Sequence, residues 1–359
     1  MSSRWSYPKS EFLSLTLPGQ VIALRLFLAL QLFVAGLWIP ASAWAQKNLP
    51  VLRLGIAGVS GTNSHPYVAR ELALFQKYGV QVELVVFQGG SQLTQAMISG
   101  DLPLALLEGT PVLASNLGSA SLVFIAGIVN TFPFTISSKA EIRNPSDLKG
   151  KKIAISRFGS SSDTAVRSAL ERYNLKPEKE VAILQIGGQS ERFAALRAGV
   201  VDAAIVSPPF NLVARRLGFN DLIDMSESGI AYAHQQVVAR RDFTERNSDQ
   251  TLAFLKGLVE GLSYWKEPGK KEAVTRTLAK FLKLDPQRDR DQLDETFRYY
   301  GKIFPAKPYP TLEGLEYSLQ LLKKVRPEAK TIQAKDFVVT RFVEELERGG
   351  FLAQLFPAR

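Results

Sequence analysis

The pattern of apolar and polar positions predicts short strands that alternate with helices from residue 51 onward. Apolar residues at Leu52, Leu54 and Ile56 alternate with other residues, as the side chains of a half-buried strand do. Val68 and Leu72 then recur at helical spacing, and the two patterns continue in turn. The predicted strands span 52–56, 80–86, 104–107 and 122–128, and the predicted helices span 64–79, 93–100 and 110–118.

The same order of elements repeats 98 to 100 residues later. The second set has predicted strands at 153–155, 181–186, 203–206 and 222–223, and predicted helices at 166–173, 193–199 and 207–218. Matching glycines keep this register, since Gly61 and Gly159 are 98 residues apart, Gly90 and Gly188 98, Gly100 and Gly199 99, and Gly118 and Gly218 100. We therefore predict an internal duplication into two α/β lobes with parallel, doubly wound sheets.

Beyond Asp242 the pattern becomes helical. Leu252, Leu255, Leu258 and Leu262 share one helix face. Further periodic segments lie at 271–283, 289–303, 312–324 and 335–348, with breaks at proline-containing stretches. The chain therefore ends in a predicted helical region.

The first 45 residues have the pattern of an export signal. A basic start is followed by an apolar run from Leu26 to Ile39, which is short for a membrane span. Ala43 and Ala45 give the small-residue pattern of a signal peptidase site, which predicts cleavage after Ala45 and a periplasmic mature chain. An uncleaved membrane anchor is the alternative interpretation.

Composition narrows the chemistry. The 359 residues contain no Cys and two His, so disulfides, thiolate nucleophiles and Cys-ligated metals are excluded, and we expect no metal site and no cofactor. The formal net charge is +10, and it falls to +8 for the 314 residues that follow the signal. Basic residues are scattered without interleaved aromatics, so we expect a solvated surface and no nucleic-acid partner.

Two loops that end a strand and open a helix are the candidate binding site. They read Gly61-Thr62-Asn63-Ser64 and Gly159-Ser160-Ser161-Ser162, at matching places in the two repeats. In open parallel sheets ligands bind beyond the carboxyl ends of the strands, and helix N-termini suit anions. Plain N-caps are the alternative for either loop alone. Neither loop has a Walker lysine or G-x-G-x-x-G, so nucleotide binding is not indicated.

Five stretches together resemble a known family. They are Leu54–Ile56 with the Gly61 loop, Phe75–Glu83, Gln88–Ser91, Asp147–Ala154 and Leu196–Ala203. From about 50 to 350 the chain resembles the solute-binding proteins of ABC importers with the type II periplasmic-binding fold. Its group contains nitrate-, sulfonate- and taurine-type binders and the thiamine-pyrimidine-precursor (NMT1/THI5-like) proteins.

The resemblance implies two lobes joined by two crossover strands, near 130–138 and 230–240. Lobe one would comprise 51–135 and 237–359, with the C-terminal helices packed on it, and lobe two would comprise 136–236. Closure of the lobes would trap the ligand. Enzymes of that superfamily use a site with Cys and His, and the lack of Cys here argues against that branch.

The candidate ligand-binding residues follow the predicted strands. In lobe one they are Ser60, Gly61, Thr62, Asn63, Ser64, Gly90, Ser91, Glu108, Gly109 and Thr110; in lobe two they are Ser156, Arg157, Phe158, Gly159, Ser160, Ser161, Gly188, Gln189, Ser207 and Pro208.

Some candidates have two interpretations. Arg157 either pairs with an anion or is a solvated surface residue. Glu108 either indicates an amine-bearing or zwitterionic ligand or is a structural acid. His65 and His234 can both reach the cleft, although a cap and a crossover residue are the alternatives. Three aromatics on the crossings either stack on the ligand or pack in the core: Phe132, Phe134 and Tyr232.

The sequence thus predicts a monomeric periplasmic substrate-binding subunit of an ABC importer, without catalytic residues. Its partners would be a small polar ligand, acidic or zwitterionic, and an ABC permease in the inner membrane. An enzyme of the pyrimidine-precursor type and a sensory module that presents ligand to a receptor are the alternatives.

Overall fold

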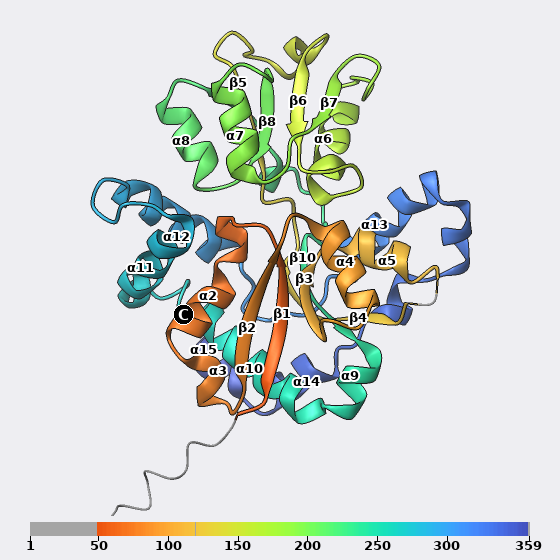
Figure 1. The fold of residues 1–359 in the computed structure, drawn as a ribbon, viewed down its shortest axis with the longest axis vertical. Helices are drawn as coiled ribbons and strands as arrows, with labels where there is room; N and C mark the ends of the chain where they lie inside the picture. Colours follow the sequence, from red (N-terminus) through yellow and green to blue (C-terminus); the bar gives the residue numbers. More distant parts are fainter. Residues whose placement is uncertain (1–48, 119, 358–359) are drawn as a thin grey trace, which may run out of the picture. The chain divides into compact units, whose positions relative to one another are not determined.

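The computed structural model describes residues 49–118 and 120–357, whose strands form two five-stranded sheets (Figure 1). The first sheet contains β1 (Val51–Ala57), β2 (Gln81–Phe87), β3 (Leu104–Leu107), β4 (Leu122–Val129) and β10 (Gln235–Arg240) in the order β2-β1-β3-β10-β4. The second contains β5 (Thr135–Ser138), β6 (Lys152–Ile155), β7 (Ala182–Gln185), β8 (Ala203–Val206) and β9 (Asn220–Asp224) in the order β7-β6-β8-β5-β9.

The two sheets have the same plan, which fits the predicted duplication. Strands β1 to β4 take the places that β6 to β9 take in the second sheet, and each sheet receives one further strand between the last two. Those inserted strands, β10 and β5, run antiparallel to both neighbours. The α/β fold class is confirmed, but the expectation of wholly parallel sheets is wrong for these two strands.

The antiparallel direction has a simple cause. The chain leaves the carboxyl end of β4 and enters the second sheet as β5, and it later returns into the first sheet as β10. The chain enters each sheet from the side where the carboxyl ends of the parallel strands lie. The inserted strand therefore runs in the opposite direction to those strands. The carboxyl ends of both sets of strands therefore face the region where the chain crosses.

The helices divide between the two sheets. With the first sheet lie α2 (His65–Glu71), α3 (Leu74–Lys77), α4 (Gly90–Ile98), α5 (Gly109–Ser115), α9 (Arg241–Arg246), α10 (Ser248–Ser263), α11 (Lys271–Leu282), α12 (Arg290–Ile303), α13 (Leu312–Val325), α14 (Arg341–Arg348) and α15 (Phe351–Leu355). With the second lie α6 (Ser161–Arg172), α7 (Gln189–Arg197) and α8 (Phe210–Arg216). Short 3-10 turns occur at Gly61–Asn63, Pro145–Leu148, Met225–Glu227, Pro268–Lys270, Pro327–Thr331 and Ala334–Phe337.

Each sheet is buried on both faces. In β3, Leu104 and Leu106 pack into the core beneath α2, α3 and α10, whereas Ala105 and Leu107 face the core beneath α4, α5 and α13. Burying a leucine side chain stabilises the fold by about 1.5–3 kcal/mol. The C-terminal helices contribute to both of these cores, which confirms the expectation that they pack on lobe one.

One predicted helix is divided. Instead of a single helix over 64–79, the structure has α2 and α3, separated where Ala73 adopts a left-handed φ of 54°. The break turns Phe75 into the core, where its ring stacks on Phe254 of α10 with centroids 5.6 Å apart. The predicted segment 335–348 likewise divides into a short 3-10 turn and α14.

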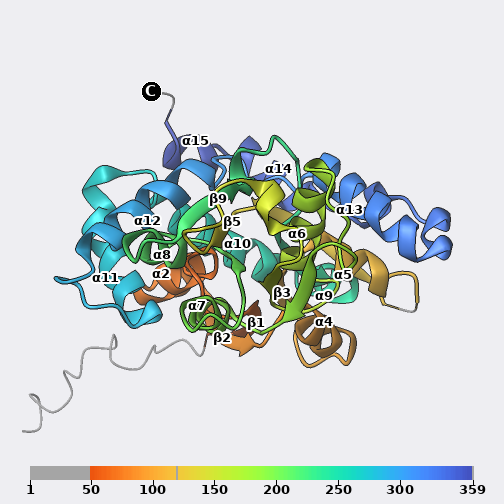
Figure 2. The same ribbon diagram turned by 90° about the horizontal axis from the view of Figure 1, so that it is seen from above.

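The two sheets also contact each other away from the crossings. Figure 2 shows α8 of the second sheet beside α12, and the pairs Arg215–Glu295 and Arg216–Asp291 join these helices, each at 3.2 Å. All four side chains are substantially exposed, so each pair contributes at most about 1 kcal/mol.

Two expectations concern boundaries. The predicted export signal, 1–45, lies outside the described residues. The division into lobes at 135/136 and 236/237 falls near the starts of β5 and β10 and stays a prediction. Within 49–118 and 120–357, none of the helices combines the length and hydropathy that crossing a membrane requires.

Candidate functional site

A cavity of about 90 Å³ lies between the two sheets, at the carboxyl ends of their parallel strands. Its walls come from the segments after β1, β2 and β3 on one side and after β6, β7 and β8 on the other, together with the crossing segments. Nine of the predicted site residues line it: Ser60, Thr62, Asn63, Gly90, Glu108, Ser156, Ser161, Gly188 and Gln189. Sites for small ligands commonly occupy such a place in open α/β sheets.

Four other predicted residues, Gly61, Ser64, Ser207 and Pro208, are buried but do not line the cavity. Gly61 packs against the carbonyl oxygen of Pro208, Ser64 donates its hydroxyl to the carbonyl of Gly61, and Ser207 pairs with the side-chain amide of Gln189. These groups are therefore occupied by protein partners rather than directed into the cavity.

Two predicted residues after β3 face elsewhere. Gly109 packs against α13, and its amide donates to the carbonyl of Ala233 at 2.8 Å. Thr110 lines a second groove, between α6 and α13, and its hydroxyl lies 3.5 Å from that of Tyr232. Ser91 is exposed on α4 and does not line the cavity.

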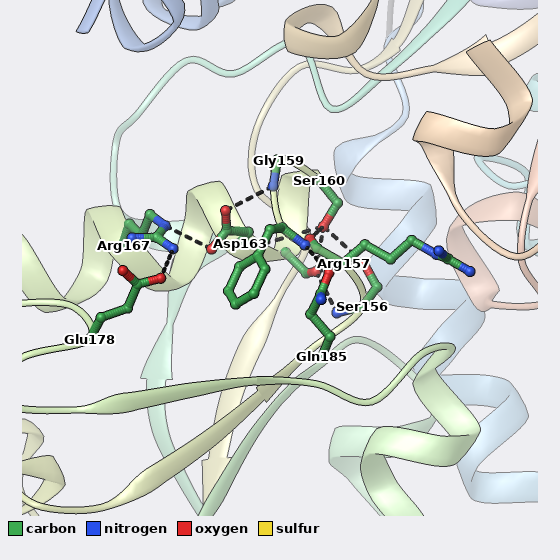
Figure 3. Close-up of polar contacts among 10 residues, drawn as sticks. Ser156, Arg157, Gly159, Ser160, Asp163, Arg167, Glu178 and Gln185 are labelled. Atoms are coloured by element: carbon green, nitrogen blue, oxygen red, sulfur yellow. Dashed lines mark hydrogen bonds and ion pairs between the residues drawn. The ribbon is translucent and has the colours of Figure 1, made fainter. Parts of the chain in front are cut away.

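The loop after β6 is stabilised mostly by its own hydrogen bonds (Figure 3). Ser160 is the N-cap of α6 and accepts from the amide of Asp163, and the amide of Gly159 donates to the carboxylate of Asp163 at 2.9 Å. Asp163 in turn pairs with Arg167 at 2.8 Å. For Gly159 and Ser160 the N-cap alternative is therefore the arrangement that the structure has.

The exposed part of this loop does not line the cavity, and Gly159 lines the groove between α6 and α13 instead. Arg157, Phe158 and Gly159 are exposed, and Figure 3 shows Arg157 extending away from the contacts of Asp163. The Arg157 side chain passes Gly89, which does line the cavity. No carboxylate of the described residues forms an ion pair with the Arg157 guanidinium.

The structure adds lining residues that the sequence did not single out as a site. They are Ala57, Gly58, Val59, Gln88, Gly89, Leu106, Ser162, Arg192 and Gln235, together with Phe134 and His234, which were considered with an alternative role. Phe132 and Tyr232 instead stack on each other in the core with ring centroids 4.0 Å apart. His65 is buried outside the cavity and contacts the carbonyl of Thr62.

Arg192 is the cation of the cavity. It is 3% exposed, and its guanidinium donates to the carbonyls of Ile205 at 2.8 Å and Gly187 at 2.6 Å. Burial lowers its pKa to about 10, which leaves it charged at neutral pH. Among the described residues it forms no ion pair.

A periodic pattern could have revealed Arg192. The buried positions of α7 are Gln189, Arg192, Phe193 and Leu196, which follow the i, i+3, i+4, i+7 spacing of one helix face. A charged residue within a buried stripe needs a partner, and a bound ligand is one possibility.

Glu108 is the acid of the cavity. One carboxylate oxygen accepts from the hydroxyl of Ser161 at 3.0 Å, across the gap between the sheets. The other, Oε2, is buried without a hydrogen-bond partner and packs against Gly90, where a β-carbon would lie 2.2 Å from it. Burial raises the pKa of this carboxyl.

Gln235 and His234, on the crossing that returns to the first sheet, line the cavity together with Glu108. Each has one buried side-chain atom without a partner in the described residues, Oε1 of Gln235 and Nδ1 of His234. Burial lowers the pKa of His234 to about 3, so its ring is neutral at physiological pH.

The closed contact between the sheets depends on Tyr300 of α12. Its hydroxyl lies 3.0 Å from Oγ1 of Thr62 and 3.3 Å from the carbonyl oxygen of Pro208. The ring is fully buried among aromatic side chains, including Trp265 and Phe304. One side chain therefore joins the loop after β1 to the loop after β8.

Comparison with known proteins shows that this chain is similar in sequence to binding proteins. The model of the family described as NMT1/THI5 like matches residues 63–270. A Bacillus subtilis protein named for binding aliphatic sulfonates is 26% identical over 253 residues, which is 68% of this chain and 74% of that protein. The taurine-binding periplasmic protein of Escherichia coli is 27% identical over 187 residues, 51% of this chain and 57% of that protein.

A solved structure shares the fold. The alkanesulfonate-binding protein SsuA from Xanthomonas axonopodis pv. citri, bound to MOPS, has a TM-score of 0.66 and 19% sequence identity. The match covers 81% of this chain and 98% of that protein. The expected periplasmic-binding fold is therefore confirmed.

Proposed function

The chain belongs to the NMT1/THI5-like family and has the substrate-binding role of its relatives, and we propose that it captures a small polar ligand, acidic or zwitterionic, between two lobes. Lobe one comprises 51–135 and 237–359, and lobe two comprises 136–236. The bound form delivers the ligand to an ABC permease in the membrane.

The observation that supports this proposal most is the position of the cavity. It lies where the carboxyl ends of two sheets face each other, and its walls come from both. The only covalent links between the lobes are the two crossings, so the remaining contacts, such as that of Tyr300 with Pro208, can break on opening. A ligand that contacts both walls favours the closed state by its differential affinity.

We expect binding without turnover. Of the serine hydroxyls that line the cavity after β6, Ser156 and Ser162 bond to each other at 2.8 Å, and Ser161 donates to the carboxylate of Glu108 at 3.0 Å. The sequence contains no Cys nucleophile. The competing proposal, an enzyme of the pyrimidine-precursor type, predicts a converted product.

The proposal includes export and a permease partner. The relatives include a protein named as periplasmic, and the first 45 residues have the pattern of an export signal. We expect the mature chain to begin after Ala45 and to act as a monomer. Mass spectrometry of the exported protein tests the cleavage, and retention of residues 1–45 would contradict it.

The test of the function is a thermal-shift screen of small anions, amines and zwitterions on the mature chain, followed by calorimetry. A ligand that binds only the folded state raises the melting temperature in proportion to the logarithm of its concentration above Kd. We expect saturable binding of at least one compound, which is recovered unchanged.

A cavity-filling variant locates the site. Ser60 is buried in the cavity wall, so Ser60→Leu is expected to abolish binding. Ser99 is exposed at the end of α4, so Ser99→Leu adds the same bulk elsewhere and is expected to leave the affinity unchanged. Equal affinities for the two variants, or conversion of the compound, would contradict the proposal.

A further inference from the structure

One wall of the cavity carries buried hydrogen-bond acceptors that no group of the protein satisfies. These are Oε2 of Glu108 and Oε1 of Gln235, two residues that are 8% and 3% exposed. A buried polar atom without a partner costs about 1–3 kcal/mol. A ligand that supplies N–H donors at this wall therefore offsets a cost that the empty cavity carries.

The hydrogen-bond network determines which end of the Gln235 amide is free. The side-chain N–H₂ of Asn63 donates to the carbonyls of Ala57 at 2.8 Å and Gly58 at 2.9 Å, so its Oδ1 must accept. The amide nitrogen of Gln235 donates to that Oδ1 at 2.6 Å. The remaining atom of Gln235 is therefore its oxygen, an acceptor.

Strand register places Glu108 and Gln235 side by side. Gln236 of β10 pairs with Leu107 of β3, so the next positions in this antiparallel ladder are Gln235 and Glu108. Opposite residues of an antiparallel pair direct their side chains to the same face of the sheet. The acid and the amide oxygen thus share a face, at the end of the ladder where the cavity begins.

The opposite charge lies on the other lobe. Arg192 lines the cavity from α7 and contacts carbonyl oxygens but no carboxylate in the described part of the chain. Glu108 forms no ion pair there either. Two buried, unpaired charges of opposite sign are costly, and a ligand that carries both charges compensates them together.

We infer that the cavity selects a small zwitterion, whose ammonium group binds Glu108 and Gln235 and whose acid group binds Arg192. This inference rests on the proposed function and narrows its ligand class. An ammonium has three N–H donors, which suffices for both free acceptors. Each end of the ligand binds a different lobe, so both charges are needed for closure.

A simple anion fits this arrangement less well. It would place negative charge in a cavity with Glu108, unless that carboxyl were protonated and donated a hydrogen bond to the anion. The neighbouring acceptor Oε1 of Gln235 would then still lack a donor. If the cavity selects a zwitterion, an ammonium group on the probe raises its affinity. If the cavity selects a simple anion, the ammonium group lowers it.

The experiment is calorimetric titration of the mature chain with four probes: 2-aminoethanesulfonate, 3-aminopropanoate, 2-hydroxyethanesulfonate and 2-aminoethanol. The first two are zwitterions with different acid groups, and each of the others lacks one charge. We expect at least one zwitterion to bind about tenfold or more tightly than both single-charge probes, as a charge-assisted hydrogen bond would give. This comparison requires no variant.

The variant Glu108→Gln keeps the shape and removes the charge. It is expected to reduce the preference for 2-aminoethanesulfonate over 2-hydroxyethanesulfonate to less than about threefold. Glu141→Gln, at an exposed acid of lobe two, is expected to keep the full preference.

Several results would overturn the inference. These are equal or tighter binding of 2-hydroxyethanesulfonate by the wild-type chain, an unchanged preference for the zwitterion in Glu108→Gln, and absence of binding by both zwitterions while another small molecule binds. In each of these cases the substrate-binding function stands. Failure of every compound in the wider screen would instead overturn the proposed function.

Discussion

Gly61 and Pro208 approach so closely that a β-carbon on Gly61 would lie 2.5 Å from the carbonyl oxygen of Pro208. The two residues follow strands of different sheets, Gly61 after β1 and Pro208 after β8. The closed arrangement therefore requires the absence of a side chain at residue 61.

The variant Gly61→Ala tests this contact. Its methyl group collides with backbone, which cannot move aside cheaply, so the closed state is destabilised relative to the open one. The β-carbon would also lie 2.5 Å from the ring of Tyr300 in the same lobe, so part of the cost falls on the open state as well. We expect the ligand affinity to fall about tenfold, which corresponds to about 1.4 kcal/mol. Gly269→Ala is the control, because a β-carbon there meets nothing within 4 Å. Unchanged affinity in Gly61→Ala would show that the lobes do not close at this contact.

The variant Tyr300→Phe removes one hydroxyl that joins the lobes. Its bond to the carbonyl oxygen of Pro208 spans the gap, and such a bond contributes about 0.5–1.5 kcal/mol. We expect a faster ligand dissociation rate, by about fivefold, measured by stopped-flow fluorescence. Tyr309→Phe is matched to it, because that hydroxyl bonds to Glu347 at 2.6 Å, away from the cavity. If both variants release ligand at the same rate, Tyr300 has no role in holding the lobes closed.

The variant Arg192→Gln distinguishes the buried arginine from the exposed one that the sequence favoured. It removes the cation that faces the cavity, and we expect the affinity for acid-bearing ligands to fall by more than about 30-fold. Arg157→Gln is expected to change the affinity by less than about threefold, because Arg157 is exposed and does not line the cavity. Arg197→Gln, exposed on the same helix as Arg192, is the control for effects on α7. A larger effect of Arg157→Gln than of Arg192→Gln would reverse this assignment.

The pH dependence of stability tests the burial of His65. Burial lowers its pKa to about 3, whereas the unfolded chain binds a proton near pH 6.5. The stability that the neutral ring contributes is complete above pH 6.5 and is lost as the pH falls toward 3, by up to about 1.4 kcal/mol per pH unit. Glu108, whose pKa is raised, acts in the opposite direction but is present in wild type and variant alike.

Urea denaturation at pH 8, 6.5 and 5 measures this effect. Between pH 6.5 and 5 the free energy of unfolding of the His65→Gln variant is expected to fall less steeply than that of the wild-type chain. Parallel pH profiles for the two proteins would mean that His65 titrates alike in the folded and unfolded states.

The sequence was sufficient to predict the fold class and the duplication. The glycine offsets arise because equivalent turns of two similar lobes need the same conformation, as at Gly100 and Gly199, whose φ values are 92° and 72°. The exchange of β5 and β10 between the sheets was not predictable from periodicity, because a strand pattern carries no information about which sheet it joins or in which direction.

The candidate site was predicted in part, for physical reasons. Loop positions after strands follow from topology, and nine of the twenty candidates line the cavity. The sequence singled out Arg157 because it stands in a polar loop, whereas Arg192, which lies among apolar residues of a helix, was not singled out. The sequence also does not show which hydroxyls already have a hydrogen-bond partner within the protein, as Ser64 has in the carbonyl of Gly61.

The central claim is that a small ligand is held between the two lobes, in contact with both Glu108 and Arg192. The most direct test is a crystal structure of the mature chain with the probe that binds most tightly. The account predicts electron density for the compound in the cavity, with its cationic group at Glu108 and its acid group at Arg192. Density in the groove between α6 and α13, with the cavity empty, would contradict it.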